Sequence, residues 1–595
     1  MTELKKKDGD REFILRTEPA EGHGFDVDLS VESERDGVRL VTVRLKAPSA
    51  AMPPKVRLEW YHPAVDVQSH WDTGSGYGWH IFPDWWMHWK PLTAKGSSGA
   101  PVVGLFNIEG RNRLTFGVSE AIQPVRIEYG MNEETSSFKC GVIFFSEAAV
   151  PLKEYSAIVR LDTRDIPVRE SLDGIQGWWA SMPEYKPCSV PEHARLPMYS
   201  TWYSFHQKLD PASVEEQCRL AKAIGCESVI VDDGWQTDDN SRGYAYCGDW
   251  EPTPAKFPDM KAHVDRVHKI GMKYLIWFSV PFVGKHSKAY ERFKDKFLSW
   301  TPEGWGTLDP RFPDVREYLT DLYVKAVREW GVDGLKLDFI DSFSFSDETR
   351  NKFGEGRDID QPERAVDVLL TTVMERLRKI NPGIMIEFRQ GYIGPLMKKF
   401  GNMLRAGDCP NDAIGNRIRS LDVRMLAGST AVHSDMMEWN LRDPVEVAAL
   451  QLLNTVFSVP QISVFLDRIP ADHQEMLKFL VSFWRENRDV LLDGRLMPLH
   501  PEMSYPQVHA STTDKYLVAL YADGLVSLNG LTQKTLIIVN ATGKDHCVVE
   551  TDGLPFGTMT LYDCRGRIVP SVKPVSDRGL VRLPLVPSGI LILKK

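Results

Sequence analysis

The sequence predicts a (β/α)8 TIM barrel, flanked by an N-terminal β-sandwich domain and a small C-terminal β-domain. From about residue 197 to residue 494, short apolar runs alternate with amphipathic helical stretches, the pattern of parallel strands joined by helices. Before residue 180 and after residue 496, apolar and polar residues alternate with a period of two and no helical period, as in antiparallel sandwiches. We expect an N-terminal β-sandwich at residues 1–185, the barrel at 186–494 and a C-terminal antiparallel β-domain at 495–595.

Composition excludes several classes of protein. The 595 residues are 43% hydrophobic and 26% charged, which are ordinary globular values. The net charge is −9 without any basic block, so nucleic acid is not an expected partner. No apolar run reaches the ~18 residues of a membrane-spanning helix, so no membrane partner is expected. The polar start lacks a secretory signal and indicates a cytoplasmic protein, or a secreted one if a signal was removed.

Eight apolar runs are candidate barrel strands, and helical patterns lie between them. The strands are expected at residues 198–205, 228–231, 273–278, 334–339, 385–388, 402–405, 431–434 and 461–465. The clearest helices are expected at residues 315–330, 363–380, 444–459 and 473–491. Another helix follows the first strand, because Asp210 is a suitable N-cap and Pro211 suits a first helical position.

Acidic, basic and aromatic side chains follow nearly every candidate strand. The C-terminal ends of barrel strands meet at one mouth, where active groups lie. Carboxylates accept hydrogen bonds from vicinal hydroxyls and tryptophan offers a flat apolar face, so this mouth suits a neutral polyhydroxylated ligand. In strand order the side chains are Trp202 and His206, then Asp232, Asp233 and Trp235, then Trp277, then Lys336 and Asp338, then Glu387, Arg389 and Gln390, then Arg405, Asp408 and Asp412, then His433 and Asp435, and finally Asp467.

Each signal also has a plainer explanation. Lys336 and Asp338 share one face of their strand and could form a structural ion pair that closes the barrel. Asp232 and Asp233 precede a glycine and could simply form a turn. The eight cysteines include no CxxC pair, and the histidines of the mouth are isolated, so they are expected to form hydrogen bonds rather than bind metal. No metal or organic cofactor is therefore predicted.

Five motifs in order resemble the melibiase-type α-galactosidases of glycoside hydrolase family 36. They are Val-Asp-Asp-Gly-Trp at residues 231–235, Gly-Asp-Trp at 248–250, Lys-Phe-Pro at 256–258, His-Lys-Ile-Gly-Met-Lys at 268–273 and Gly-Leu-Lys-Leu-Asp at 334–338. The flanking β-domains also suit that family. The resemblance implies a retaining, exo-acting glycoside hydrolase that releases terminal α-linked galactose through two carboxylates.

The resemblance also assigns roles within the barrel mouth. Asp338 matches the family's nucleophile, and Asp408 resembles the acid/base, with Asp412 as the alternative. Asp232 and Asp233 would grip O4 and O6 of galactose, Lys336 would reach neighbouring hydroxyls, and Arg405 would hold the O2 side. Trp235 and Trp277 would wall the pocket. The further substrate-binding residues expected at this mouth are Trp202, Arg389 and His433.

Two departures from the family bear on specificity. The third strand continues as Trp-Phe-Ser-Val-Pro at residues 277–281, where the family has an acidic Trp-Phe-Glu-Pro-Glu pattern. The fifth strand ends in Glu-Phe-Arg-Gln-Gly at residues 387–391, where many members have Cys-Ser-Gly-Gly. The Arg and Gln could accept a different C2 substituent or a charged leaving group.

Other functions therefore stay open. The same chemistry could act on an α-N-acetylgalactosaminide or an α-glucoside, or in transglycosylation, and a non-catalytic sugar-binding protein is a third hypothesis. The segment from Trp71 to Trp89 holds five of the 17 tryptophans and could form either a sugar subsite or an interdomain seal. The expected partner is a small carbohydrate, and the sequence leaves a homo-oligomer open.

Overall fold

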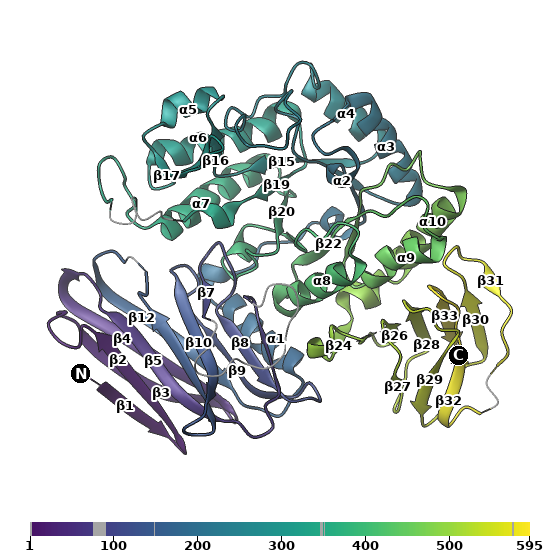
Figure 1. Ribbon diagram of the computed structural model, residues 1–595, viewed down its shortest axis with the longest axis horizontal. Coiled ribbons are helices and arrows are strands. Elements are labelled where there is room, and N and C mark those ends of the chain that lie inside the picture. The colour runs from purple at the N-terminus through teal and green to yellow at the C-terminus, as the bar shows by residue number, and fades with distance from the viewer. Residues whose placement is uncertain (1–2, 75–90, 148, 345–348, 350–351, 574–575) are drawn as a thin grey trace.

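A closed barrel of eight parallel strands forms the centre of the molecule (Figure 1). The computed structural model describes residues 3–74, 91–147, 149–344, 349, 352–573 and 576–595. The strands, in barrel order, are β13 Met198–Ser200, β14 Ser228–Val231, β15 Lys273–Ser279, β19 Gly334–Asp338, β20 Met385–Arg389, β21 Met403–Arg405, β22 Ala431–Met437 and β23 Val459–Ile462. The predicted barrel is confirmed.

Helices follow most of these strands and cover the barrel. They are α3 Pro211–Ile224, α4 Met260–Ile270, α5 Lys288–Phe293, α6 Pro313–Lys325, α7 Pro362–Ile380, α8 Ala413–Ala427, α9 Val445–Asn454 and α10 Ala471–Glu486. Helix α3 shows why the sequence forms them here. The Asp210 side chain accepts a hydrogen bond from the Ser213 amide at its start, and Gly225 ends it in the left-handed region (φ 105°), a conformation that favours glycine.

The barrel differs from the expectation in three connections. Residues 202–205 form a short helix, α2 Trp202–Phe205, rather than the end of a strand, because the Tyr203 and Ser204 amides donate to Ser463 Oγ instead of a strand ladder. Only a 3-10 turn, η6 Met397–Lys399, stands in the connection between β20 and β21. A small sheet of β16 Phe282–Gly284, β17 Phe297–Trp300 and β18 Trp305–Leu308 is inserted after β15.

The N-terminal region is a sandwich of two six-stranded sheets around its own hydrophobic core. One sheet contains β1 Glu3–Asp8, β2 Arg11–Glu18, β5 Lys55–Pro63, β11 Ser137–Phe144, β10 Val125–Asn132 and β7 Leu92–Ala94, and the other contains β3 Asp26–Arg35, β4 Val38–Ala51, β12 Leu152–Asp162, β9 Asn112–Val118, β8 Val102–Phe106 and β6 Ser69–Asp72. Helix α1 Val168–Ala180 packs against β8, β9 and α8 and so connects the sandwich to the barrel.

The C-terminal region holds two further sheets around a separate core. The larger contains β24 Arg495–Leu499, β25 Gln507–Ser511, β26 Lys515–Leu520, β28 Thr535–Asn540, β33 Ile590–Lys594, β30 Thr558–Tyr562 and β31 Ile568–Val569, and the smaller contains β27 Leu525–Ser527, β29 His546–Thr551 and β32 Gly579–Pro584. It is not wholly antiparallel, because β26 with β28 and β27 with β29 pair in parallel. The exact domain boundaries stay predictions.

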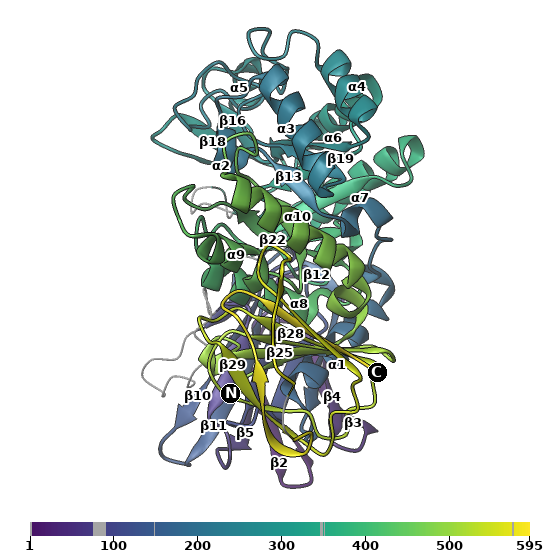
Figure 2. The ribbon, with the colours of Figure 1, turned by 90° about the vertical axis from the view of Figure 1, so that its right-hand side faces the viewer.

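Both β regions lie on the same side of the barrel (Figures 1 and 2). The N-terminal sandwich packs under the part of the barrel that carries α8, and the C-terminal sheets lie beside it below α9 and α10. No helix among the described residues is long and apolar enough to cross a membrane.

Candidate active site

Asp338 ends β19 and is held by donors from several directions. Its Oδ1 accepts from the Phe339 amide at 2.9 Å and the Tyr392 hydroxyl at 3.2 Å. The Arg389 Nε lies 2.7 Å from the same oxygen. Oδ2 accepts from Trp277 Nε1 at 3.1 Å. The carboxylate is therefore fixed in one orientation, with 10% of its side chain exposed.

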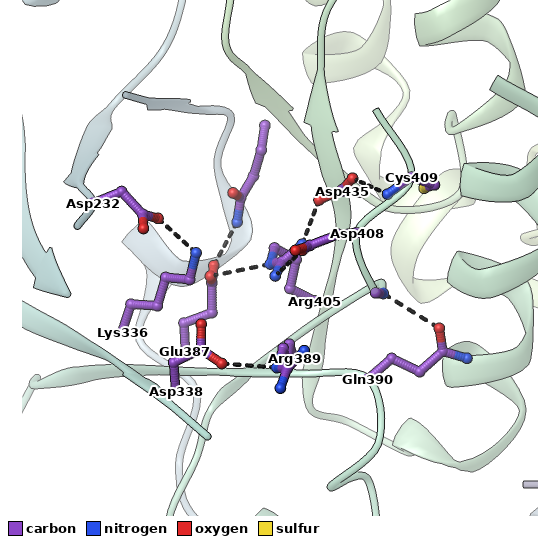
Figure 3. Close-up of polar contacts among 12 residues, drawn as sticks. Asp232, Lys336, Asp338, Glu387, Arg389, Gln390, Arg405, Asp408, Cys409 and Asp435 are labelled. Atoms are coloured by element: carbon purple, nitrogen blue, oxygen red, sulfur yellow. Dashed lines mark hydrogen bonds and ion pairs between the residues drawn. The ribbon is translucent and has the colours of Figure 1, made fainter. Parts of the chain in front are cut away.

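A second pair lies on the neighbouring wall of the barrel. Lys336 Nζ donates to Asp232 Oδ2 at 2.6 Å, and both side chains are buried (Figure 3). The adjacent Asp233 accepts from Gln207 and Gln236, each at 2.7 Å, and burial raises its pKa to about 6. Lys336 thus pairs with Asp232, which follows β14, two strands away in the barrel, and not with Asp338, the partner considered from the sequence.

Arg405, at the end of β21, contacts three acidic side chains. It lies 2.8 Å from Asp408 and 3.6 Å from Glu387, and its Nη1 donates to Asp435 (Figure 3). Asp435 also accepts from the Cys409 amide at 2.7 Å. Because Arg405 is 1% exposed, several carboxylates around it offset the cost of burying its charge.

The cations of the site favour the charged forms of Asp338 and Asp408. Burial alone would raise the pKa of each carboxyl group. For Asp338, the positive charges of Arg389 and Lys336 more than offset burial and lower the pKa. For Asp408, Arg405 and Lys336 offset burial and lower the pKa to about 2.

A cavity of about 270 Å³ opens beside Asp408, between the barrel and the N-terminal sandwich. It is bounded by β6 and the residues after it, by the loops that follow β20 and β21, and by α8. Its lining residues are Trp71, Asp72, Thr73, Gly99, Arg389, Gln390, Gly391, Ile393, Gly407, Asp408, Arg419 and Asp422. Polar groups and Asp408 thus meet in a space of the size of a small ligand.

Two of the predicted site residues are fully buried and engaged in contacts within the core. Trp235 has no exposed surface and packs against Trp250, Phe278 and Trp330, so it is part of the core and does not wall a pocket. His433 is also fully buried: its Nε2 donates to Ala194 O and its Nδ1 accepts from the Gln461 amide group. Burial lowers its pKa to about 4. It is a neutral structural histidine in this arrangement.

The remaining predictions have mixed outcomes. The Asp412 side chain caps α8 by accepting from the Gly415 amide at 2.8 Å. Trp202, in α2, is partly exposed and carries the Arg242 guanidinium 5.2 Å from its ring centre. In the predicted aromatic segment, Trp71 is buried and donates to Asp422 at 3.0 Å, whereas Trp79, Trp85, Trp86 and Trp89 lie outside the described residues.

The structure brings three further residues to the site: Tyr392, which the sequence did not indicate, and Tyr203 and Asp435, which follow candidate strands but were given no role. Tyr392 reaches Asp338, and Tyr203 donates to Asp435 at 2.8 Å. Asp435 lies two residues after His433, where the register of β22 shifts against β23, and a bulge of this kind re-aims side chains. The strand-end position of Asp435 was a usable signal, whereas nothing local marked Tyr392. Within the described parts of the chain, no cluster of three or more His, Cys, Asp or Glu side chains is placed to hold a metal ion.

Comparisons with known proteins agree with the motifs. Residues 190–392 match the Melibiase family model. Alpha-galactosidase 1 of Pediococcus pentosaceus is 34% identical over 134 residues, which are 22% of this chain and 16% of that protein. The alpha-galactosidase of Escherichia coli is 26% identical over 159 residues, 25% of this chain and 22% of that protein. The alignments therefore span less than a quarter of these relatives' lengths.

Solved structures with the same fold cover nearly the whole chain. The alpha-galactosidase of Lactobacillus brevis superposes with a TM-score of 0.67 at 14% identity, over 100% of this chain and 83% of that one. The GH36 alpha-galactosidase AgaA of Geobacillus stearothermophilus, solved as a variant with raffinose, gives 0.65 at 13% identity, over 99% and 84%. The fold is thus that of the glycoside hydrolases of family 36. Within it, the resemblance to the melibiases is confirmed for residues 190–392.

Proposed function

We propose that the protein is a retaining, exo-acting glycoside hydrolase that cleaves terminal α-linked galactose, with Asp338 as nucleophile and Asp408 as acid/base. The observation that carries this proposal is the pair Arg389 and Arg405, which face each other in the register of β20 and β21. Arg389 binds Asp338 and Arg405 binds Asp408. The two carboxylates are thus anchored by neighbouring arginines at the same barrel mouth, and a glycoside hydrolase of this kind uses two carboxyl groups.

The state of Asp338 suits a nucleophile. Attack on an anomeric carbon needs an ionised carboxylate in a fixed orientation, and the donors around Asp338 favour both. Trp277 approaches it from β15 and Tyr392 from the loop after β20, so the carboxylate keeps its position when one of these contacts is exchanged for substrate. The low pKa of Asp338 keeps it charged through the neutral and mildly acidic range.

The position of Asp408 suits the leaving-group side. Its carboxylate is half-exposed and lines the cavity next to the N-terminal sandwich. An acid that protonates the glycosidic oxygen has to stand beside the departing group, and this cavity offers room for one. Asp412 is the poorer candidate, because its carboxylate is used as a helix cap.

The ion pair with Arg405 has a consequence for the reaction. With a pKa of about 2, Asp408 is ionised in the free protein at neutral pH, whereas a general acid must start protonated. Substrate binding therefore has to weaken the hold of Arg405 on Asp408. Arg405 has Asp435 and Glu387 as alternative partners, so its charge stays compensated when Asp408 takes up a proton.

The choice of sugar depends on the Asp232–Lys336 pair. Asp232 and Lys336 form a buried donor and acceptor pair that can bind adjacent hydroxyl groups, and the relatives that the sequence matches include alpha-galactosidases. Galactose is therefore the first substrate to test. Arg389 and Gln390 replace the residues typical of the family, and they are the reason to include N-acetylgalactosaminides and glucosides.

The proposal is tested with 4-nitrophenyl α-galactoside, α-N-acetylgalactosaminide and α-glucoside on the wild type and on Asp338→Ala. We expect release of nitrophenol from the galactoside, none from Asp338→Ala, and α-galactose as the first sugar product by NMR, which reports retention. An inverted product would contradict the double displacement. Binding of galactose without turnover of any glycoside would favour the sugar-binding hypothesis.

A further inference from the structure

Arg389 connects two carboxylates, one at the end of β19 and one just after it. Its Nε lies 2.7 Å from Asp338 Oδ1, and its Nη2 lies 3.6 Å from Asp341 Oδ1. Its guanidinium also lies 4.8 Å from the centre of the Phe339 ring. Arg389 itself ends β20, and Asp341 lies in the 3-10 turn η5 Ile340–Ser342. The orientation of Asp338 therefore depends on two loops, one after β19 and one after β20.

A turn of the N-terminal sandwich packs against the second of these loops. Residues 95–99, here named the 95–99 turn, follow β7 and are closed by hydrogen bonds between Lys95 and Ser98 at 2.9 and 3.0 Å. The Gly99 amide donates to Gly391 O at 2.5 Å, two residues after Arg389. A Cβ added at Gly394 would lie 2.7 Å from Gly99 O, so this contact is tight backbone against backbone.

The same turn reaches the first loop through one side chain. Lys95 Nζ donates to Phe343 O at 3.1 Å and to Ser344 Oγ, directly after η5. Another hydrogen bond, from the Gly96 amide to Ile122 O at 2.9 Å, ties the turn to the rest of the sandwich. One short segment of the N-terminal region thus holds both loops of the Asp338 wall.

We propose that the 95–99 turn is a brace that positions the Arg389–Asp338 pair for catalysis, with Lys95 as a positioning residue that touches neither substrate nor reacting atom. The inference rests on the proposed function of Asp338. Loops are the mobile part of a barrel mouth, and groups that react must be held within a fraction of an ångström of their productive geometry. A brace from a second domain supplies that constraint to both loops.

Two variants remove the brace in different ways. Lys95→Met keeps the side-chain length and loses the contacts with Phe343 and Ser344, whereas Gly394→Ala forces the loop away from Gly99. Because a displacement of about 1 Å can cost about 100-fold in rate, we expect kcat on 4-nitrophenyl α-galactoside to fall about 10- to 100-fold in each. KM should stay within about threefold, since no substrate contact is removed, and Lys95→Arg should restore most of kcat.

Matched controls exclude general damage. Lys55→Met removes an exposed pair with Glu18 on β5 of the same sandwich, and Gly177→Ala adds a methyl group where nothing lies within 4 Å. Both should retain kcat. Amide hydrogen exchange provides a readout that does not need turnover: in Lys95→Met and Gly394→Ala, exchange should rise in peptides spanning residues 340–344 and 390–397 but not in those from β26 and β28.

The outcomes separate this inference from the proposed function. Active, folded variants with kcat within twofold of the wild type would overturn the brace, and so would an exchange increase spread evenly over the barrel, which reports destabilisation alone. If the wild type hydrolyses no α-glycoside, the proposed function fails and exchange decides the brace. In that case, faster amide exchange in the two loops alone supports the brace, and unchanged exchange in both variants rejects it.

Discussion

The two proposed catalytic carboxylates stand in contrasting surroundings. Asp338 ends a strand, exposes 10% of its side chain, accepts hydrogen bonds from Trp277 and Tyr392, and forms an ion pair with Arg389. Asp408 lies on a loop three residues beyond β21, exposes 52% of its side chain and pairs with Arg405. The Asp338 side chain is thus held by several groups, whereas the Asp408 side chain pairs with Arg405 and is open to the cavity.

This difference matches what a double displacement demands of its two carboxyl groups. The nucleophile keeps its charge until it attacks, so fixed donors and cations assist it. The acid/base exchanges a proton twice in each cycle, and a group with one partner and access to the cavity can change its charge more readily. The contrast predicts different responses when each carboxylate or its arginine is removed.

The largest effect is expected from Asp338→Ala. Removing a nucleophile leaves only binding and electrostatic stabilisation, so kcat should fall by at least about 10⁴-fold. The fold should survive, because the cations around Asp338 retain other acidic neighbours. Kinetics on an activated aryl galactoside and a melting temperature by circular dichroism check this. Turnover close to the wild-type rate would remove Asp338 from its role.

A smaller and substrate-dependent effect is expected from Asp408→Ala. Loss of a general acid costs about 10²- to 10⁴-fold when the leaving group needs a proton, and much less for nitrophenolate, which leaves unaided. We therefore expect a large loss on a disaccharide and a modest loss of the first step on the nitrophenyl glycoside. Because the pKa of Asp408 is about 2, kcat/KM of the wild type on the disaccharide should also decline as pH rises. Equal losses on both substrates would contradict the assignment.

Arg389→Gln should have a moderate effect with a distinctive pH dependence. Loss of one partner of the buried ion pair with Asp338 should lower kcat/KM about 10- to 100-fold. Arg389 lowers the pKa of Asp338, so its removal raises that pKa. The acid limb of the profile should then move to higher pH, because Asp338 stays protonated over a wider range. Arg376→Gln, on the exposed face of α7, is the control, and an unshifted acid limb would show that Arg389 does not act on Asp338.

The sequence predicted the barrel and its charged mouth because both depend on local patterns. Strand period, helix caps such as Asp210 and acids at strand ends are visible within a few residues. The partners were not visible: Lys336 was considered with Asp338 on its own strand, but it pairs with Asp232 on another. Trp235 stands in a family motif yet is buried among other aromatic rings. The direction of a side chain beyond the end of a strand depends on packing between segments that are distant in the sequence. The contacts of the 95–99 turn with the loops after β19 and β20 are an example.

The smallest effect separates the two candidates for the acid/base. Asp412 accepts from the Gly415 amide at the start of α8, so Asp412→Ala should cost about 0.5–2 kcal/mol of stability, as N-cap losses do. Its kcat on a disaccharide should stay near that of the wild type, since its carboxylate is committed to the helix. Asp412→Asn, which keeps a capping oxygen, should recover most of the stability in denaturant unfolding. If Asp412→Asn instead loses about 100-fold in kcat while Asp408→Ala does not, the acid/base is Asp412, and the leaving-group side of the site is built around the helix start rather than around Arg405.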